Sequence, residues 1–80
     1  MEFIPYRAEV IGPVLRKLRE DAGLSQEVLS GLAGIARSHL SMIETGVKQP
    51  NLETIWKLAL ALNLAPHMLV AAFEAAAKEK

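Results

Sequence analysis

Four helix-ending residues divide this chain into short segments: Gly23, Gly34, Gly46 and Asn63. Gly and Asn readily adopt the left-handed conformation that ends many helices. The segments between them carry apolar residues at three- and four-residue spacings, as one face of an α-helix does. The clean alternation of apolar and polar residues that indicates a half-buried strand is absent. The sequence therefore predicts an all-α fold, a compact bundle of about five short helices.

Residues that favour helix starts refine these boundaries. Ser25 and Asn51 can cap a helix through a side-chain oxygen, while Pro13 and Pro66 suit a first helical turn. We predict helices over residues 11–23, 26–33, 36–45, 52–62 and 66–80, preceded by an N-terminal arm of residues 1–10. The last helix is expected to fray at its tail.

The length fits a single domain over residues 1–80. The chain is 51% hydrophobic, and a domain this small buries only roughly 60% of the surface that its unfolded chain exposes. The residues at helical spacing are expected to face the core: Ile11, Val14, Leu15, Leu18, Ala22, Val28, Leu29, Leu32, Ile35, Leu40, Ile43, Leu52, Ile55, Leu58, Ala59, Leu62, Leu69, Val70 and Phe73. Such a small core favours association with a partner.

The composition argues against an enzyme. The chain has no cysteine, so neither a disulfide nor a thiolate metal site is possible. His39 and His67 do not have the spacing of a metal-ligand pair, and no nucleophile elbow or glycine-rich phosphate loop is present. We expect no metal, no cofactor and no catalytic residues.

The most apolar stretch, residues 58–77, is not expected to cross a membrane. Asn63, Pro66, His67 and Glu74 interrupt it, and polar groups are costly in lipid. No basic region leads into an apolar run near the N-terminus, so no signal peptide is expected. We expect a cytoplasmic protein without a membrane partner.

Residues 25–45 have the pattern of a helix-turn-helix. Ser30 is small enough for close helix approach, and Gly34 can take the positive φ of a tight turn. Apolar residues on both sides would anchor the two helices: Leu29 and Leu32 before the turn, and Ile35, Leu40 and Ile43 after it.

The segments "GLSQEVLS", "SHLSMIETG" and "PNLETIWKLALAL" resemble the phage repressor/Cro-type, or XRE-type, helix-turn-helix family. The resemblance covers roughly residues 11–73. It implies a lambda-repressor-like DNA-binding domain of about five helices that binds operator DNA, usually as a dimer. Members of this length resemble stand-alone regulators, including restriction-modification controller proteins and some antitoxins.

The outward face of residues 36–45 is the candidate for reading DNA bases. A recognition helix presents its N-terminal residues to base edges in the major groove. Arg37 can make a bidentate contact with guanine. The base-contacting candidates are Arg37, Ser38, Ser41 and Met42.

Contacts with DNA phosphates are expected at the start of the helix over 26–33 and around the end of the helix over 36–45. A helix N-terminus offers free N–H groups and a favourable dipole, and Gln26 matches a phosphate-contacting position of the family. The candidates are Ser25, Gln26, His39, Thr45, Lys48 and Gln49.

The charges of the chain do not favour DNA at first sight. Nine basic residues balance nine acidic ones, giving a formal net charge of +0, whereas DNA-binding proteins usually have a basic surface. The resemblance implies an ion pair between Arg19 and Glu44. That pair would neutralise Glu44 within the fold and leave the DNA-facing side locally positive.

A dimer interface is expected on the fourth and fifth helices. Trp56 and Leu60 lie four residues apart and off the stripe that faces the core, and Leu64 and Met68 continue the apolar surface. Exposed apolar patches usually mark partner sites. Alternatively, the last helix and the arm, with Phe3, Ile4 and Tyr6, cover these residues within one monomer.

The sequence therefore indicates a transcriptional regulator, a repressor by its family resemblance, that binds a palindromic operator in double-stranded DNA as a homodimer. Two alternatives stay open. The same fold can serve as a protein-binding module with weak DNA contact, which the neutral charge and Ala36, an N-cap without a side-chain oxygen, would suit. An antitoxin-like protein would bind both a partner protein and its operator.

Overall fold

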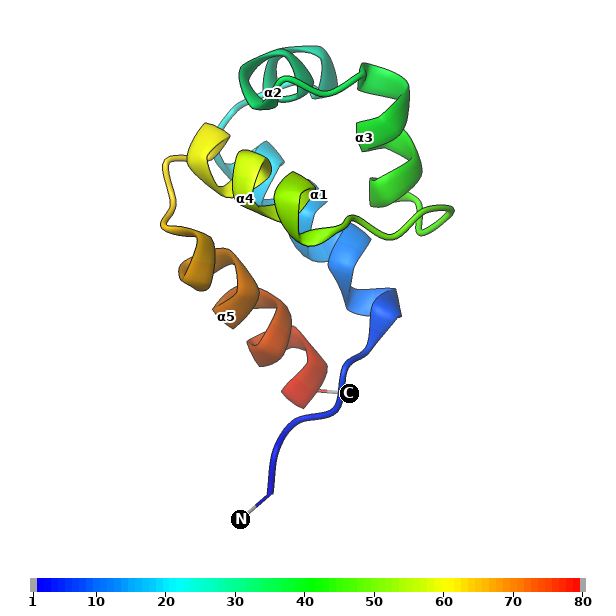
Figure 1. The fold of residues 1–80 in the computed structure, drawn as a ribbon, viewed down its shortest axis with the longest axis vertical. Helices are drawn as coiled ribbons and strands as arrows, with labels where there is room; N and C mark the ends of the chain where they lie inside the picture. The colour runs from blue at the N-terminus through cyan, green and yellow to red at the C-terminus, as the bar shows by residue number, and fades with distance from the viewer. Residues whose placement is uncertain (1, 80) are drawn as a thin grey trace.

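The computed structural model describes residues 2–79, and this range contains one short 3-10 helix and five α-helices, with no strand (Figure 1). The elements are η1 (Ala8–Val10), α1 (Ile11–Asp21), α2 (Gln26–Ala33), α3 (Arg37–Glu44), α4 (Leu52–Ala61) and α5 (Pro66–Lys78). The predicted all-α fold is confirmed, and each predicted helix is present with bounds within about two residues of those expected. Met1 and Lys80, the ends of the predicted arm and last helix, lie outside the described residues.

The helix ends follow the predicted chemistry. The Ser25 hydroxyl accepts a hydrogen bond from a backbone N–H in the first turn of α2 at 3.1 Å, and the Asn51 side-chain oxygen does the same for α4 at 2.8 Å. Gly34 and Asn63 have φ angles of 70° and 61°, the left-handed conformation that permits a sharp change of direction. Short helices with well-defined ends are the result.

The core contains one side chain or more from each α-helix. Its largest fully buried side chains are Leu15, Leu29, Leu40, Ile43, Leu58 and Leu69. Helix α2 packs against α4 and α3, α1 packs against α3 and α5, and α4 packs against α5. Aliphatic residues dominate this contact surface, so burial of apolar area is the main stabilising contribution.

Five predicted core residues are exposed instead: Ala22, Val28, Leu32, Leu52 and Val70. Helix α2 turns Leu29, Ser30 and Ala33 inward, one residue further along than the predicted set, so Leu32 keeps 62% of its surface exposed. Ala22 and Leu52 lie at helix ends, beyond the packed faces. Val70 lines a surface pocket.

The elements divide the molecule into two ends. Helices α2 and α3 lie at one end, whereas the arm and the C-terminal part of α5 lie at the other (Figure 1). No single helix within residues 2–79 is long and apolar enough to cross a membrane. Helices α4 and α5 reach that length and composition only together, and they are bent by 104°.

Candidate nucleic-acid interface

Helices α2 and α3 form a helix-turn-helix through a three-residue turn. Ser30 is buried, which lets α2 lie close to its neighbours. After Gly34 reverses the chain, the Ile35 N–H donates to the Ser30 carbonyl at 3.0 Å. The predicted roles of Ser30 and Gly34 in the turn are confirmed, whereas the predicted anchor Leu32 faces solvent.

The two sides of α3 differ sharply. Leu40 and Ile43 are almost completely buried and fix the helix to the core. The predicted base-contacting residues lie mainly on the free side: Arg37, Ser38 and Met42 are exposed, and Ser41 is half-buried. Arg37 is the first residue of α3. In helix-turn-helix proteins, the N-terminal residues of the second helix are the ones that contact base edges in the major groove of DNA.

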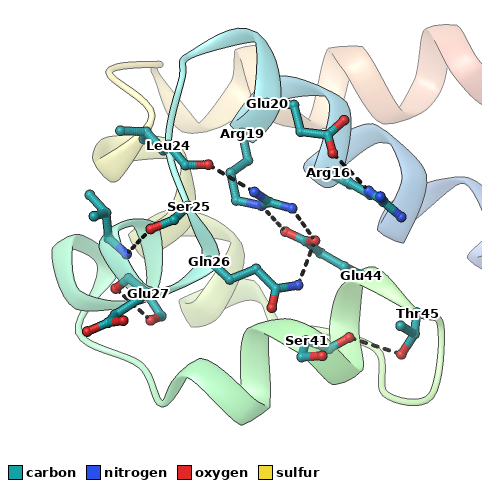
Figure 2. A network of polar contacts seen from close by, with 12 residues as sticks. Arg16, Arg19, Glu20, Leu24, Ser25, Gln26, Glu27, Ser41, Glu44 and Thr45 are labelled. Atoms are coloured by element: carbon teal, nitrogen blue, oxygen red, sulfur yellow. Dashed lines mark hydrogen bonds and ion pairs between the residues drawn. The ribbon is translucent and has the colours of Figure 1, made fainter.

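A buried ion pair joins α1 to α3. Arg19 Nε donates to Glu44 Oε2 at 2.7 Å, and Arg19 Nη2 donates to Glu44 Oε1 at 3.0 Å (Figure 2). This is the bidentate geometry of a strong charge-assisted pair. Arg19 Nη1 also donates to the Leu24 carbonyl at 2.9 Å, which fixes the chain just before α2.

Gln26 completes this network. Its Nε2 donates to Glu44 Oε1 at 3.0 Å, so the start of α2 is attached to the end of α3 (Figure 2). Gln26 was expected to contact phosphate, and its contact with Glu44 was not predicted. The two residues are 18 positions apart, and this spacing does not predict a hydrogen bond between them. The three-residue network defines how α1, α2 and α3 lie relative to one another.

The network keeps Glu44 charged despite its burial. Burial raises the pKa of the Glu44 carboxyl, but the hydrogen bonds from Arg19 and Gln26 and the charge of Arg19 outweigh it, so its pKa lies below the ordinary value of 4.5. The hydrogen bond to Glu44 raises the pKa of Arg19, although burial opposes it. Both groups are ionised near neutral pH, and the pair adds no net charge to the interface.

The lowered pKa makes part of the stability dependent on pH. At pH values between the pKa of Glu44 in the folded protein and 4.5, its pKa in the unfolded chain, the unfolded chain binds more protons than the folded protein. The contribution of Glu44 to the free energy of unfolding is therefore complete above pH 4.5 and is lost as the pH falls through the pKa of the folded protein. We expect the free energy of unfolding to decrease less steeply below pH 4.5 in Glu44→Gln than in the unmodified protein. Urea unfolding at a series of pH values measures the difference, and equal slopes would contradict the assignment.

Other predicted phosphate-contacting residues lie on α3 or in the segment directly after it. Thr45 Oγ1 donates to the Ser41 carbonyl at 2.9 Å, and Gln49 Oε1 accepts from the Tyr6 hydroxyl at 2.8 Å. Lys48 is exposed, and His39 is half-buried. Thr45 and Gln49 thus have partners within the fold, while the Lys48 ammonium faces solvent. Their role toward phosphate stays a prediction.

Helix α1 approaches the end of α3 very closely at Gly12, a contact that was not predicted from the sequence. A Cβ atom at this position would lie 2.7 Å from the Ile43 carbonyl oxygen and would also overlap the Glu44 carbonyl oxygen. Only glycine lets the two backbones come this near. Gly12 and the ion pair therefore hold α3 in the same place.

A second surface is apolar. Trp56 and Leu60 on α4 are 53% and 61% exposed, and Met68 on α5 is also exposed, whereas Leu64 is half-buried against the core. The arm does not cover this surface: Phe3 and Tyr6 are themselves exposed, and Ile4 to Arg7 line a pocket against α1 and α5 that does not include Trp56 or Leu60. The alternative in which the monomer buries Trp56 and Leu60 is wrong.

Comparison with known proteins identifies the architecture. A family model described as helix-turn-helix matches residues 15–69. The crystal structure of the restriction-modification controller protein C.AhdI from Aeromonas hydrophila is 42% identical, with a TM-score of 0.72, over 79% of this chain and 98% of that one. SinR, described as the master regulator for biofilm formation and solved in complex with DNA, is 31% identical, with a TM-score of 0.69, over 75% of this chain and 97% of that one.

A curated relative extends beyond this domain. The uncharacterized HTH-type transcriptional regulator y4dL from Sinorhizobium fredii is 41% identical over 59 residues. The match covers 74% of this chain but 30% of that protein, so the similarity concerns the helix-turn-helix region. The family match spans more than half of the chain and includes all of helices α2, α3 and α4. The chain therefore belongs to the XRE-type helix-turn-helix family.

Proposed function

We propose that this protein is a sequence-specific DNA-binding transcriptional regulator in which α3 enters the major groove. The observation that carries the proposal is the two-sided character of α3. Leu40 and Ile43 are buried while Arg37 stands exposed at its first position. The similarity to SinR, whose structure was solved in complex with DNA, supports DNA binding by this chain. Arg37 contacts a base edge, Ser38, Ser41 and Met42 lie against neighbouring bases, and Lys48 contacts phosphate.

The Arg37→Ala variant is expected to lose operator preference while keeping its fold. A bidentate arginine–guanine contact contributes about 1–3 kcal/mol of discrimination, so preference over random DNA should fall by a factor of roughly 5 to 150. The measurement is affinity for a selected operator and for random DNA at one stated salt concentration. Lys78→Ala removes the same charge from the last residue of α5 and should leave the preference unchanged. Retained preference in Arg37→Ala would refute the assigned role.

We also propose that the regulator acts as a homodimer on a palindromic operator. Two recognition helices then lie about 34 Å apart on one face of DNA. The exposed patch of Trp56, Leu60 and Met68, with Leu64 at its edge, supplies apolar surface for the contact. Dimerisation also fits the neutral charge of the chain, because one copy neutralises few phosphates and binds weakly.

Trp56→Ala and Leu60→Ala are expected to shift the protein toward the monomer. Each removes a large side chain from the proposed interface, and truncated interface anchors commonly cost about 2 kcal/mol or more, roughly thirtyfold in the dimer dissociation constant. Sedimentation at several concentrations measures the shift. Val47→Ala, in an exposed apolar position of the loop after α3, is the control. An unaltered dimer in both α4 variants would exclude this surface.

A second candidate function is binding of a partner protein through the same fold. SinR has also been solved in complex with SinI protein, and the N-cap residue of α3 here, Ala36, supplies no side-chain hydrogen bond. Salt dependence separates the two functions, because DNA affinity falls steeply as salt rises. Retention on DNA that does not respond to salt, or absence of DNA binding at low salt, would favour the partner protein.

A further inference from the structure

The arm is joined to the loop that follows α3 by a hydrogen bond between two side chains. The Tyr6 hydroxyl donates to Gln49 Oε1 at 2.8 Å, although the two residues are 43 positions apart in the sequence. Both side chains are exposed, and Tyr6 keeps 72% of its surface in contact with solvent. The hydrogen bond therefore lies on the surface, directly after the helix proposed to enter the major groove.

The backbone around Gln49 is held in place. The Lys48 N–H donates to the Met42 carbonyl at 3.1 Å, so the loop folds back onto α3 just before Gln49. The next residue, Pro50, disfavours the helical conformation at Gln49 and keeps its backbone extended. Pro50 also borders the same pocket as Tyr6, so loop and arm lie close together there. With its backbone held in this way, the orientation of Gln49 is decided by its side chain.

The chemistry of the amide gives the contact with Tyr6 a direction. A glutamine side chain has an oxygen that accepts and an NH2 group that donates, whereas the oxygens of a DNA phosphate accept from protein donors. The Tyr6 hydroxyl donates to Gln49 Oε1, which leaves the two hydrogens of Gln49 Nε2 for another partner. The hydroxyl thus selects the amide orientation in which the donor is available to an acceptor such as phosphate.

We propose that Tyr6 is a positioning residue, which holds the Gln49 side chain ready to donate from Nε2 to a DNA phosphate. The inference rests on the proposed function, since it requires DNA against the loop after α3. The exposed Lys48 ammonium, from the preceding residue, contacts a neighbouring phosphate. Because the hydrogen bond orders the Gln49 side chain before DNA binds, less conformational entropy is lost on binding.

The rest of the arm does not supply this link. Ile4 and Pro5 border a largely apolar pocket against α1 and α5, and the Nε of Arg7 has no hydrogen-bond partner among residues 2–79. These residues hold the arm to the fold without directing the Gln49 amide. Loss of the Tyr6 hydroxyl alone should therefore release the Gln49 side chain and leave the arm and the five helices in place.

Tyr6→Phe removes only the hydroxyl and tests the proposal. Affinity for DNA should fall roughly threefold per subunit, and roughly tenfold for a dimer on a palindromic operator, as expected for one ordinary hydrogen bond in each subunit. Phosphate contacts carry no direct sequence information, so binding to operator and to random DNA should weaken by the same factor. The salt dependence should keep its slope, because neither Tyr6 nor Gln49 carries a charge at neutral pH. Fluorescence anisotropy at several salt concentrations measures all three quantities, and Phe3→Ala, 80% exposed in the same arm, is the control.

Variants of Gln49 show whether Tyr6 acts through it. Gln49→Glu keeps an oxygen that accepts from Tyr6 but offers no donor to phosphate, so it should weaken DNA binding more than Tyr6→Phe does. In a Gln49→Ala background, Tyr6→Phe should have no further effect, as expected for two coupled residues. A Tyr6→Phe effect that persists in that background would mean that Tyr6 contacts DNA itself, and would overturn the proposal.

The outcomes also separate this inference from the proposed function. If operator preference is lost in Arg37→Ala while Tyr6→Phe binds DNA as well as the unmodified protein, the proposed function stands and the role of Tyr6 is refuted. Tighter DNA binding by Tyr6→Phe would show that the hydroxyl withholds Gln49 from phosphate, which also overturns the proposal. Absence of DNA binding by the unmodified protein at low salt would refute both.

Discussion

Glu44→Ala is expected to lower the free energy of unfolding by about 3–5 kcal/mol, the usual cost of breaking a buried ion pair. Arg19 is buried and donates to both oxygens of Glu44. Its charge would remain in the core without a partner. A domain of 80 residues has roughly 4–12 kcal/mol of total stability, so a substantial fraction unfolded is expected. Urea unfolding followed by circular dichroism provides the measurement.

The companion variants show whether the stranded charge is the cause. Arg19→Met combined with Glu44→Leu removes both charges and should recover most of the loss, since apolar replacements of buried pairs are often neutral or stabilising. Gln26→Ala removes a single hydrogen bond to the charged Glu44 carboxylate and should cost about 1.5–3 kcal/mol, less than the loss of the ion pair. A double variant as unstable as Glu44→Ala would show that the shape of the pair, rather than its charge, is what matters.

Gly12→Ala is expected to destabilise the protein by about 1–3 kcal/mol, the typical cost of overpacking. The added Cβ would meet the carbonyl oxygens of Ile43 and Glu44. These are backbone atoms and cannot move aside by changing rotamer, so α1 and α3 must separate. Alanine's better helix propensity offsets up to about 1 kcal/mol of this cost. Thermal and urea unfolding measure the net change.

Gly31→Ala is the matched control for this substitution. Gly31 lies inside α2, and no atom beyond its chain neighbours and the adjoining backbone of its own helix lies within 4 Å of the Cβ that alanine would add. The same chemical change should therefore stabilise the protein by up to about 1 kcal/mol. If both variants shift stability in the same direction, the close approach at Gly12 is not the determining factor.

The existence and limits of the helices could be predicted because local chemistry decides them. Ser25, Asn51, Gly34 and Asn63 act on their own backbone neighbourhood, and each behaves as the sequence indicates. The rotation of a short helix is less certain. In α2 the buried set is displaced by one residue from the predicted one, which rotates the helix by about 100°. A helix of eight residues such as α2 has too few apolar positions for the sequence to determine which side faces the core.

Some features of the candidate site could be predicted from the sequence, and others could not. The exposure of Arg37 and the Arg19–Glu44 pair could be expected from the family resemblance. The contact of Gln26 with Glu44 and that of Tyr6 with Gln49 depend on three-dimensional packing of distant segments. The periodicity of the sequence does not predict such contacts. The unpartnered Nε of Arg7 is likewise a property of how the arm packs and not of its composition.

The carboxylate of Glu44 also determines which parts of the molecule can open separately. Because its two oxygens receive donors from both α1 and α2 while its backbone belongs to α3, none of these helices can detach without stranding a charge or a donor. Native-state hydrogen exchange should then show the amides of these helices exchanging as one cooperative foldon. In the proposed contact with DNA, the surface of α2 and α3 would then move as a rigid block, and sequence preference would come from its prearranged shape rather than from a change of conformation on binding.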